Sequence, residues 1–198
     1  MLKVALTGGI GSGKTTVSRI FEHIYHIPIY SADEHAKLLM EQDENIKSQL
    51  LDIMGNESYM NQQLNRPYLA NILFHNIEIK TKIDNLVHTA VIHDYLQWSE
   101  QPLNVPYYLH EAALVFEAKM EHLFDKIIVV YSPMEIKIQR LLKKGMTLND
   151  IRARMNAQIP DEEKIKKADF IITNNEQESL IEQVIVIHKQ LNNCPDIH

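Results

Sequence analysis

The stretch that decides the fold runs from residue 8 to residue 15 and reads Gly8-Gly9-Ile10-Gly11-Ser12-Gly13-Lys14-Thr15. It matches the pattern G-x-x-x-x-G-K-[ST], follows the apolar run Lys3–Thr7 and precedes the helical pattern Thr16–His23. Glycines reach backbone conformations that other residues avoid, so successive N–H groups can turn inward and form a nest for phosphate oxygens. The positive end of a helix starting at Lys14 adds to this attraction. The context therefore predicts a strand, a phosphate-binding loop and a helix, in that order.

Each side chain of this loop has a predicted task in holding ATP. The Lys14 ammonium bridges the outer phosphates, and the Thr15 hydroxyl ligates the Mg²⁺ ion carried by the nucleotide. Thr16 reaches an inner phosphate. The rest of the cradle is expected from the backbone of Gly9, Gly11, Ser12 and Gly13. A glycine-rich turn can match the pattern by chance, but here the strand, loop and helix signals agree, and the sequence predicts a site for ATP and Mg²⁺.

The remaining apolar runs indicate a parallel sheet. They are short, continuous and rich in β-branched or aromatic residues, as in strands buried on both faces: Ile27–Tyr30, Val105–His110, Lys126–Tyr131 and Asp169–Thr173. Helical patterns fill the intervals, which indicates a doubly wound α/β fold. We predict a three-layer P-loop NTPase fold with a parallel five-stranded sheet, a helical acceptor-binding insert and a helical lid.

The insert is predicted because the second gap between strands holds more chain than one crossover needs. Helical spacing covers Glu34–Gly55, Pro67–Lys80 and Thr81–Glu100, while Asn56–Arg66 is polar and is expected to be a loop. The 198 residues are too few for two ordinary domains and a linker. We therefore expect one domain, with its core at about 1–33, 104–133 and 168–198, the insert at about 34–103 and the lid at about 134–167.

The expected lid is a pair of helical segments, Met134–Lys144 and Thr147–Gln158, separated by Gly145. The pair is rich in basic residues: Lys137, Arg140, Lys143, Lys144, Arg152 and Arg154. Such a run is commonly a solvated charged face. In chain order, however, it stands where a mobile lid would close over ATP, neutralise the phosphates and exclude water. An amphipathic helix is expected at Gln177–Leu191.

Composition and charge exclude several classes. The net charge of −6 argues against a general nucleic-acid binder. The single cysteine, Cys194, permits no intrachain disulfide and suits a reducing compartment. The N-terminal residues lack the pattern of a signal peptide, and no apolar run approaches the roughly 18 residues of a membrane span. We expect a cytoplasmic protein with a small-molecule partner, no nucleic-acid or membrane partner, and a monomeric or weakly homo-oligomeric state.

Asp33 is the candidate catalytic base. It follows the second predicted strand in Tyr30-Ser31-Ala32-Asp33, and ligands of such folds bind at the carboxyl ends of the strands. A carboxylate there can orient an acceptor hydroxyl and accept its proton. Alternatively, Asp33 is the N-cap of a helix beginning at Glu34.

Over nearly the whole chain the motifs resemble the dephospho-coenzyme A kinase family. The resemblance rests on four segments: Leu6–Lys14, Ser31–Lys37, His110–Glu117, and Arg152–Gln158 followed by Lys164 and Ala168–Asn174. It implies ATP-dependent phosphorylation of the 3′-hydroxyl of dephospho-coenzyme A, giving coenzyme A and ADP, the last step of coenzyme A synthesis. The loop motif alone is shared by many families, and its combination with the other segments is far more specific.

The resemblance also implies roles for individual residues. Asp33 would be the base, acting with Lys14, Arg140 and Arg154 in catalysis. Arg140 would lie over the adenine, and Asn174 or Asn175 would border it. The acceptor would meet Asp33, His88, Glu111, Leu114 and Phe116, and the metal would be held by Thr15 and Glu111. His88 taken alone would be a surface histidine of a helix.

Some positions depart from the family pattern. Thr89 replaces a proline, Lys143 and Lys144 stand near an expected arginine, Ala112-Ala113 replaces a proline-containing stretch, and no glycine follows Asn174. Lysine keeps the charge but lacks the bidentate fork of arginine.

Two other functions remain open from the residues. One is another small-metabolite kinase with a nucleoside, nucleotide or sugar-like alcohol as acceptor. The other is a nucleotide-dependent switch or ATPase that phosphorylates nothing, although no guanine-reading Asn-Lys-x-Asp motif is present.

Overall fold

The computed structural model describes residues 1–102 and 104–193, and Cys194 lies outside them. This part of the chain folds into two compact units. The first comprises Met1–Tyr30 and residues 104–193, and the second comprises Ser31–Pro102.

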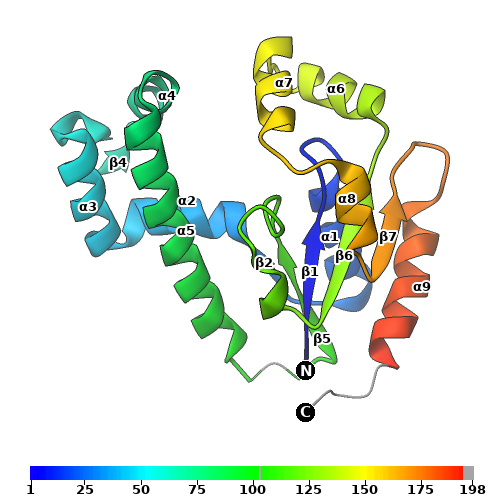
Figure 1. Cartoon of the computed structure of the whole chain (residues 1–198). Coiled ribbons are helices and arrows are strands. Elements are labelled where there is room, and N and C mark those ends of the chain that lie inside the picture. The colour runs from blue at the N-terminus through cyan, green and yellow to red at the C-terminus, as the bar shows by residue number, and fades with distance from the viewer. Residues whose placement is uncertain (103, 194–198) are drawn as a thin grey trace. The chain divides into compact units, whose positions relative to one another are not determined.

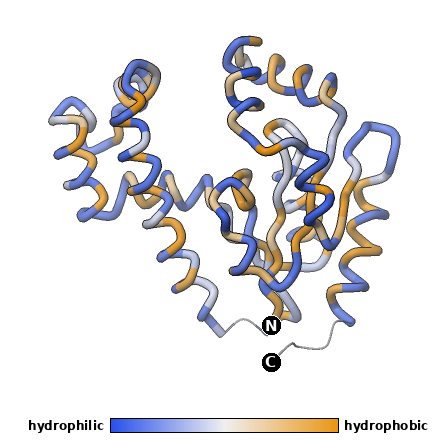
Figure 2. Tube along the Cα trace, viewed as in Figure 1, coloured by the Kyte–Doolittle hydropathy of each residue, from blue (hydrophilic) through white to orange (hydrophobic). Residues whose placement is uncertain are grey.

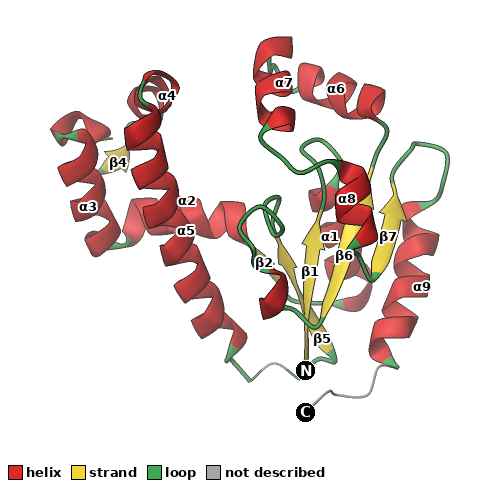
Figure 3. Cartoon of the chain, in the orientation of Figure 1, coloured by secondary structure: helices red, strands yellow, loops and turns green. Residues whose placement is uncertain are grey.

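The first unit is built on a parallel sheet with the strand order β2-β5-β1-β6-β7 (Figures 1 and 3). Its strands are β1 (Leu2–Thr7), β2 (Ile29–Ser31), β5 (Tyr107–Glu111), β6 (Lys126–Tyr131) and β7 (Phe170–Thr173). The central strand β1 pairs with β5 from Leu2 opposite Tyr107 to Leu6 opposite Glu111, and with β6 on its other side. The predicted five-stranded parallel α/β fold is confirmed.

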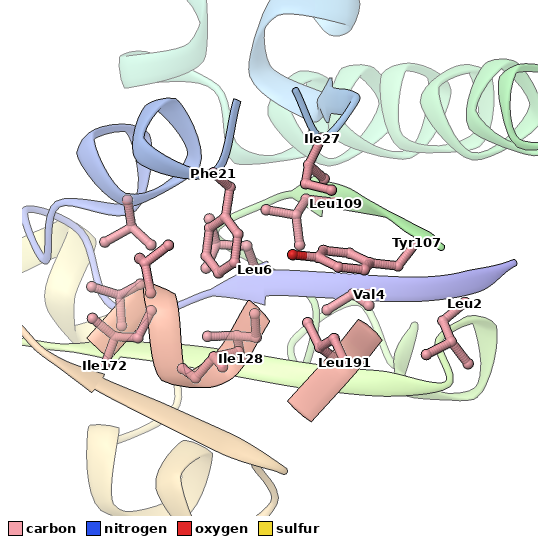
Figure 4. Packing of buried hydrophobic residues seen from close by; sticks show 14 residues of the cluster. Leu2, Val4, Leu6, Phe21, Ile27, Tyr107, Leu109, Ile128, Ile172 and Leu191 are labelled. Atoms are coloured by element: carbon pink, nitrogen blue, oxygen red, sulfur yellow. The ribbon is translucent and has the colours of Figure 1, made fainter. Parts of the chain in front are cut away.

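One face of the sheet is covered by α1 (Lys14–Tyr25) and α9 (Leu180–Asn192), which contact each other. Figure 4 shows the core between them, where Leu6, Phe21 and Leu191 converge. Figure 2 shows hydrophobic and hydrophilic residues alternating along α9, as a helix with one buried face requires. Each fully buried Leu or Phe side chain contributes roughly 1.5–3 kcal/mol relative to an exposed one. This core fixes the start of α1, and with it the loop that precedes the helix.

Three helices lie between β6 and β7: α6 (Met134–Lys143), α7 (Leu148–Asn156) and α8 (Asp161–Lys166). Gly145 lies just past α6 with φ of +83°, and Thr147 caps α7 by accepting a hydrogen bond from the Asp150 N–H. The sequence analysis did not identify α8, because its six residues are too few to show helical periodicity. The expected C-terminal helix begins three residues late, at Leu180, since Ser179 is its N-cap.

The second unit contains four helices: α2 (Ala32–Gln42), α3 (Glu44–Met54), α4 (Arg66–His75) and α5 (Ile77–Ser99). Its own core is formed by Ile46, Leu50, Met54 and Ile83, with partly buried side chains around them.

Three expectations for this unit were wrong in detail. Glu34–Gly55 is two helices, because Asp43 ends the first and caps the second by accepting from Asn45 N and Ile46 N. Asn76 separates the next two helices, five residues before the boundary expected at Thr81. The expected loop over residues 56–66 holds a short 3₁₀ turn, Asn56–Ser58, and a small antiparallel hairpin of β3 (Tyr59–Met60) and β4 (Gln63–Leu64).

Across residues 1–102 and 104–193, no helix combines the length and apolar character that a membrane crossing requires.

Candidate active site

The site is centred on the loop Gly8–Thr15, which connects β1 to α1 (Figure 1). Gly13, the residue before the helix, has φ of +96°, and a Cβ there would lie 2.2 Å from Asn174 Nδ2. A side chain at this position would thus be both strained and sterically excluded. The Gly13 carbonyl accepts from the N–H groups of Thr16 and Val17, so the first turn of α1 closes directly onto the loop.

Lys14 folds over the loop that precedes it. Its ammonium donates to the carbonyls of Gly8 and Gly9, at 3.0 and 3.3 Å. Ser12 N–H donates back to the Gly9 carbonyl at 3.1 Å, which tightens the turn. The structure thus brings together the loop glycines, Ser12, Lys14, Thr15 and Thr16.

Thr15 and Glu111 meet at the end of β5. The Thr15 hydroxyl donates to Glu111 Oε1 and the Ser18 hydroxyl donates to Oε2, both at 2.7 Å. Glu111 is only 9% exposed. The sequence analysis missed Ser18, although its place one helical turn after Thr15 puts both hydroxyls on the same face.

The Thr15–Glu111 pair has the donor chemistry that Mg²⁺ requires. Mg²⁺ prefers oxygen ligands and is often held by one or two protein groups, with phosphates and water completing the octahedron. Within the described ranges, no cluster of three or more His, Cys, Asp or Glu residues is arranged to hold a metal ion. A hydroxyl and a carboxylate beside a phosphate-binding loop therefore suit an ion that arrives with the nucleotide.

Arg140 and Asn174 lock the other side of the loop. Arg140, in α6, donates through Nη2 to Asn174 Oδ1 at 2.9 Å and through Nη1 to the Ser12 carbonyl at 3.3 Å. Asn174, 7% exposed just after β7, donates from Nδ2 to the same Ser12 carbonyl at 2.8 Å. Arg140 Nη2 also reaches Glu176 Oε1 at 3.2 Å. Two segments far from the loop in sequence thus converge on the Ser12 carbonyl.

The neighbouring Asn175 has a local task. Its Oδ1 accepts from the N–H groups of Gln177 and Glu178, both at 3.0 Å, and its Nδ2 donates to the Glu178 carboxylate. Asn175 therefore shapes the turn before α9, whereas Asn174 contacts the loop itself.

Two of the predicted acceptor residues lie in the segment after β5. Phe116 is buried, at 3% exposure, and the Lys167 ammonium stands 5.5 Å from its ring centre. Leu114, at 36% exposure, is accessible to solvent.

Asp33 and His88 belong to the second unit. Asp33 lies exposed in the first turn of α2, whose N-cap is Ser31. The alternative that Asp33 is the N-cap is therefore wrong, and its carboxylate remains accessible. Two residues on, His35 Nδ1 lies 2.7 Å from Asp94 Oδ2, which ties α2 to α5. His88 is exposed on α5.

The basic residues of the expected lid differ in their environments. Arg154 is exposed in the last turn of α7, and Lys143 and Lys144 are exposed at the end of α6. Lys137 is buried, at 6% exposure, and forms an ion pair with Asp161. For Lys137 the interpretation as part of a solvated face is therefore wrong, and a single lysine at helical spacing carries no sequence signal that would have revealed it.

Similarity to known proteins extends over almost the whole chain. A family model described as dephospho-CoA kinase matches residues 2–180. A dephospho-CoA kinase of Geobacillus kaustophilus is 34% identical over 194 residues, covering 96% of each chain. One of Bacteroides fragilis is 31% identical over 185 residues, covering 93% of this chain and 90% of that protein. The solved structure of a dephospho-CoA kinase from Campylobacter jejuni superposes with a TM-score of 0.71 at 25% identity, covering 96% of both chains.

Proposed function

The chain belongs to the dephospho-CoA kinase family, and we propose that it transfers the terminal phosphate of ATP to the 3′-hydroxyl of dephospho-coenzyme A through the site described above. The observation that carries the proposal is the loop Gly8–Thr15, whose last residue donates to the buried carboxylate Glu111. A family of alcohol-phosphorylating enzymes needs a phosphate cradle with an oxygen-ligand site beside it, and both are present in one compact unit.

The reaction forms one P–O bond and breaks another. The 3′-oxygen of the acceptor bonds to the γ-phosphorus, the bond to the β,γ-bridging oxygen breaks, and ADP leaves with that electron pair. The loop N–H groups and Lys14 hold the phosphates, and because phosphoryl transfer needs little covalent help, positioning and charge stabilisation supply most of the acceleration. Thr15 and Glu111 would hold Mg²⁺, which supplies charge neutralisation on the transferring phosphate when bound.

Asp33 takes the role of the base. Its carboxylate accepts the proton that the 3′-hydroxyl loses, and Arg140 and Arg154 add positive charge for the phosphates. The exposure of Asp33 in the first turn of α2, two residues after β2 ends, supports this role, because its side chain is accessible to an acceptor. Asn174, Asn175 and Arg140 would border the adenine of ATP.

His88, Leu114 and Phe116 are the proposed contacts of dephospho-coenzyme A. We further propose a cytoplasmic enzyme, monomeric or weakly self-associating, without a nucleic-acid partner. The net charge of −6 and the single cysteine support this assignment.

The test is a product assay with a panel of acceptors. The protein is incubated with ATP, Mg²⁺ and either dephospho-coenzyme A, nucleosides, nucleotides or sugar-like alcohols, and the products are weighed by mass spectrometry. We expect one added phosphate on dephospho-coenzyme A alone. If another alcohol is phosphorylated instead, the chain is a different small-metabolite kinase.

A variant separates binding from chemistry. Asp33→Asn should bind MgATP with wild-type affinity while kcat falls by about 10²–10⁴-fold, the range attributed to a positioned general base. Undiminished turnover would remove Asp33 from the proposal without affecting the loop.

A further inference from the structure

The chain between α7 and α8 crosses beside the phosphate-binding loop (Figure 1). Gln158 Oε1 accepts a hydrogen bond from the Ile10 N–H at 2.8 Å, across 148 residues of sequence. Gly9 and Ile10 form the outer half of the loop, ahead of the N-cap Gly13 and of Lys14 and Thr15, which open α1. A side-chain amide therefore holds a part of the loop that the helix does not hold.

A buried ion pair contacts the same part of the loop. Lys137 of α6 and Asp161 of α8 form it, with side chains only 8% and 15% exposed. A Cβ placed on Gly9 would lie 2.9 Å from Asp161 Oδ1 and 3.3 Å from Lys137 Nζ. The pair thus packs directly against the loop backbone, an approach that only a glycine at residue 9 permits. A buried charge without a partner is costly, so Lys137 and Asp161 hold each other in place. The loop therefore lies against a fixed ion pair.

Residues 158–164 are also held on the side away from the loop. Glu117, in the segment after β5, accepts from the Ile159 N–H at 2.9 Å and forms an ion pair with Lys164 at 2.8 Å, both through Oε1. The Lys164 side chain is fully buried. Residues 158–164 are thus held by the body of the first unit on one side while they contact the loop on the other.

We propose that residues 158–161, together with Lys137, brace the outer half of the phosphate-binding loop, and that Gln158, Lys137 and Asp161 are positioning residues for ATP. The proposal rests on the proposed function, because it assigns the site's nucleotide to this loop. A cradle held in its binding geometry loses less free energy to ordering when the phosphates arrive. Each brace residue acts through Gly9 or Ile10, and none of them needs to touch the nucleotide.

The two partners of the ion pair should have unequal effects on ATP. Replacing either one breaks the same contact, so their effects on stability should be similar. Lys137→Met leaves the Asp161 carboxylate against a loop that binds anions, whereas Asp161→Asn leaves an ammonium there. MgATP affinity should therefore fall further in Lys137→Met than in Asp161→Asn. A pair that only stabilises the fold would leave the MgATP affinity of both folded variants unchanged.

The experiment measures MgATP affinity by titration calorimetry on the full chain, with the KM for dephospho-coenzyme A measured in parallel. We expect Gln158→Met, which keeps the length but removes the acceptor, to raise the Kd for MgATP roughly five- to tenfold, as the loss of one hydrogen bond implies. The acceptor KM should stay within about twofold. The exposed Gln190→Met and Lys82→Met serve as matched controls, and they should bind MgATP like the wild type.

Several outcomes would overturn the brace. One is a folded Gln158→Met with wild-type affinity for MgATP, and another is wild-type affinity in both Lys137→Met and Asp161→Asn. If the variants do not fold, hydrogen exchange in the wild type decides: the Ile10 amide should be protected without ATP, and exchange at the rate of an open loop would refute the contact. A wild type that does not bind MgATP would instead refute the proposed function.

Discussion

The phosphate-binding loop and the helical unit Ser31–Pro102 are held together in different ways. Around the loop, buried and half-buried polar side chains from distant segments converge on a few backbone atoms, as when Arg140 and Asn174 both reach the Ser12 carbonyl. The helical unit has an apolar core of Ile46, Leu50, Met54 and Ile83, and exposed ion pairs such as Arg66–Glu41 on its surface. At the loop, the hydrogen bonds to single backbone atoms thus require particular side chains. In the helical unit, the core mainly requires side chains of suitable size and polarity.

The largest expected effect comes from a pair of glycines, one in each region. Gly13→Ala sets a Cβ 2.2 Å from Asn174 Nδ2 at φ of +96°, whereas Gly55, at φ of +85°, has no atom within 4 Å of its added Cβ. Gly13→Ala should lower kcat/KM at least about 100-fold, the scale of losing a preorganised donor set. Gly55→Ala should cost about 1–3 kcal/mol of stability through backbone strain alone, because φ of +85° with ψ of 175° is a conformation essentially limited to glycine. Steady-state kinetics and urea unfolding are measured on both variants. Equal losses of activity would contradict the difference between the two regions.

The second prediction concerns the core of the helical unit. Leu50 is fully buried, and Leu50→Ala should lower the unfolding free energy by about 2–5 kcal/mol. The acceptor KM should rise, and the Kd for MgATP should stay near the wild-type value, because the loop belongs to the other unit. Ile77→Ala, at a position 81% exposed, is the matched control and should change neither. A large loss of MgATP affinity in Leu50→Ala would show that the two regions are not independent.

The third prediction compares an arginine at the loop with an arginine in the helical unit. Arg140→Lys cannot keep contacts to both Ser12 and Asn174, because lysine lacks the planar fork of donors. The Kd for MgATP should rise by roughly tenfold, the equivalent of one or two hydrogen bonds. Arg66→Lys alters an exposed pair with Glu41, and such pairs contribute at most about 1 kcal/mol. The same titration, run on both variants, should separate them; similar affinities would contradict the difference between regions.

The smallest effect concerns a polar contact of the first unit outside the loop. Tyr107 and His188 Nδ1 form a 2.8 Å hydrogen bond, Tyr25 stacks on the imidazole, and burial lowers the pKa of His188 while it raises the pKa of Tyr107. The folded state thus takes up a proton on His188 less readily than the unfolded state. Stability from this group is complete above the ordinary pKa of 6.5 and is lost as the pH falls below it.

Urea unfolding at pH 7 and pH 5 tests this sign. His188→Phe should lose about 1 kcal/mol at pH 7 through the missing hydrogen bond, but should show a flatter pH dependence than the wild type. A steeper dependence in the variant would contradict the direction of the pKa shift.

The sequence predicted those elements of the fold and the site that depend on residues close together in the chain. β6 occupies Lys126–Tyr131 as expected, and the glycines with Lys14 identified the loop, because periodicity and loop chemistry depend on near neighbours. The break at Asp43 was missed since a capping aspartate inside an apolar pattern looks the same as an exposed one. Contacts such as Gln158 with Ile10 join residues 148 positions apart, and nothing in either segment alone specifies the partner.

The measurement that tests the central claim most directly follows the phosphate itself. ATP carrying ¹⁸O on its γ-phosphate is incubated with the protein, Mg²⁺ and dephospho-coenzyme A, and the product is fragmented by tandem mass spectrometry. We expect the labelled phosphoryl group to appear intact on the 3′-oxygen of the ribose. Label found only in inorganic phosphate, with dephospho-coenzyme A unchanged, would contradict it.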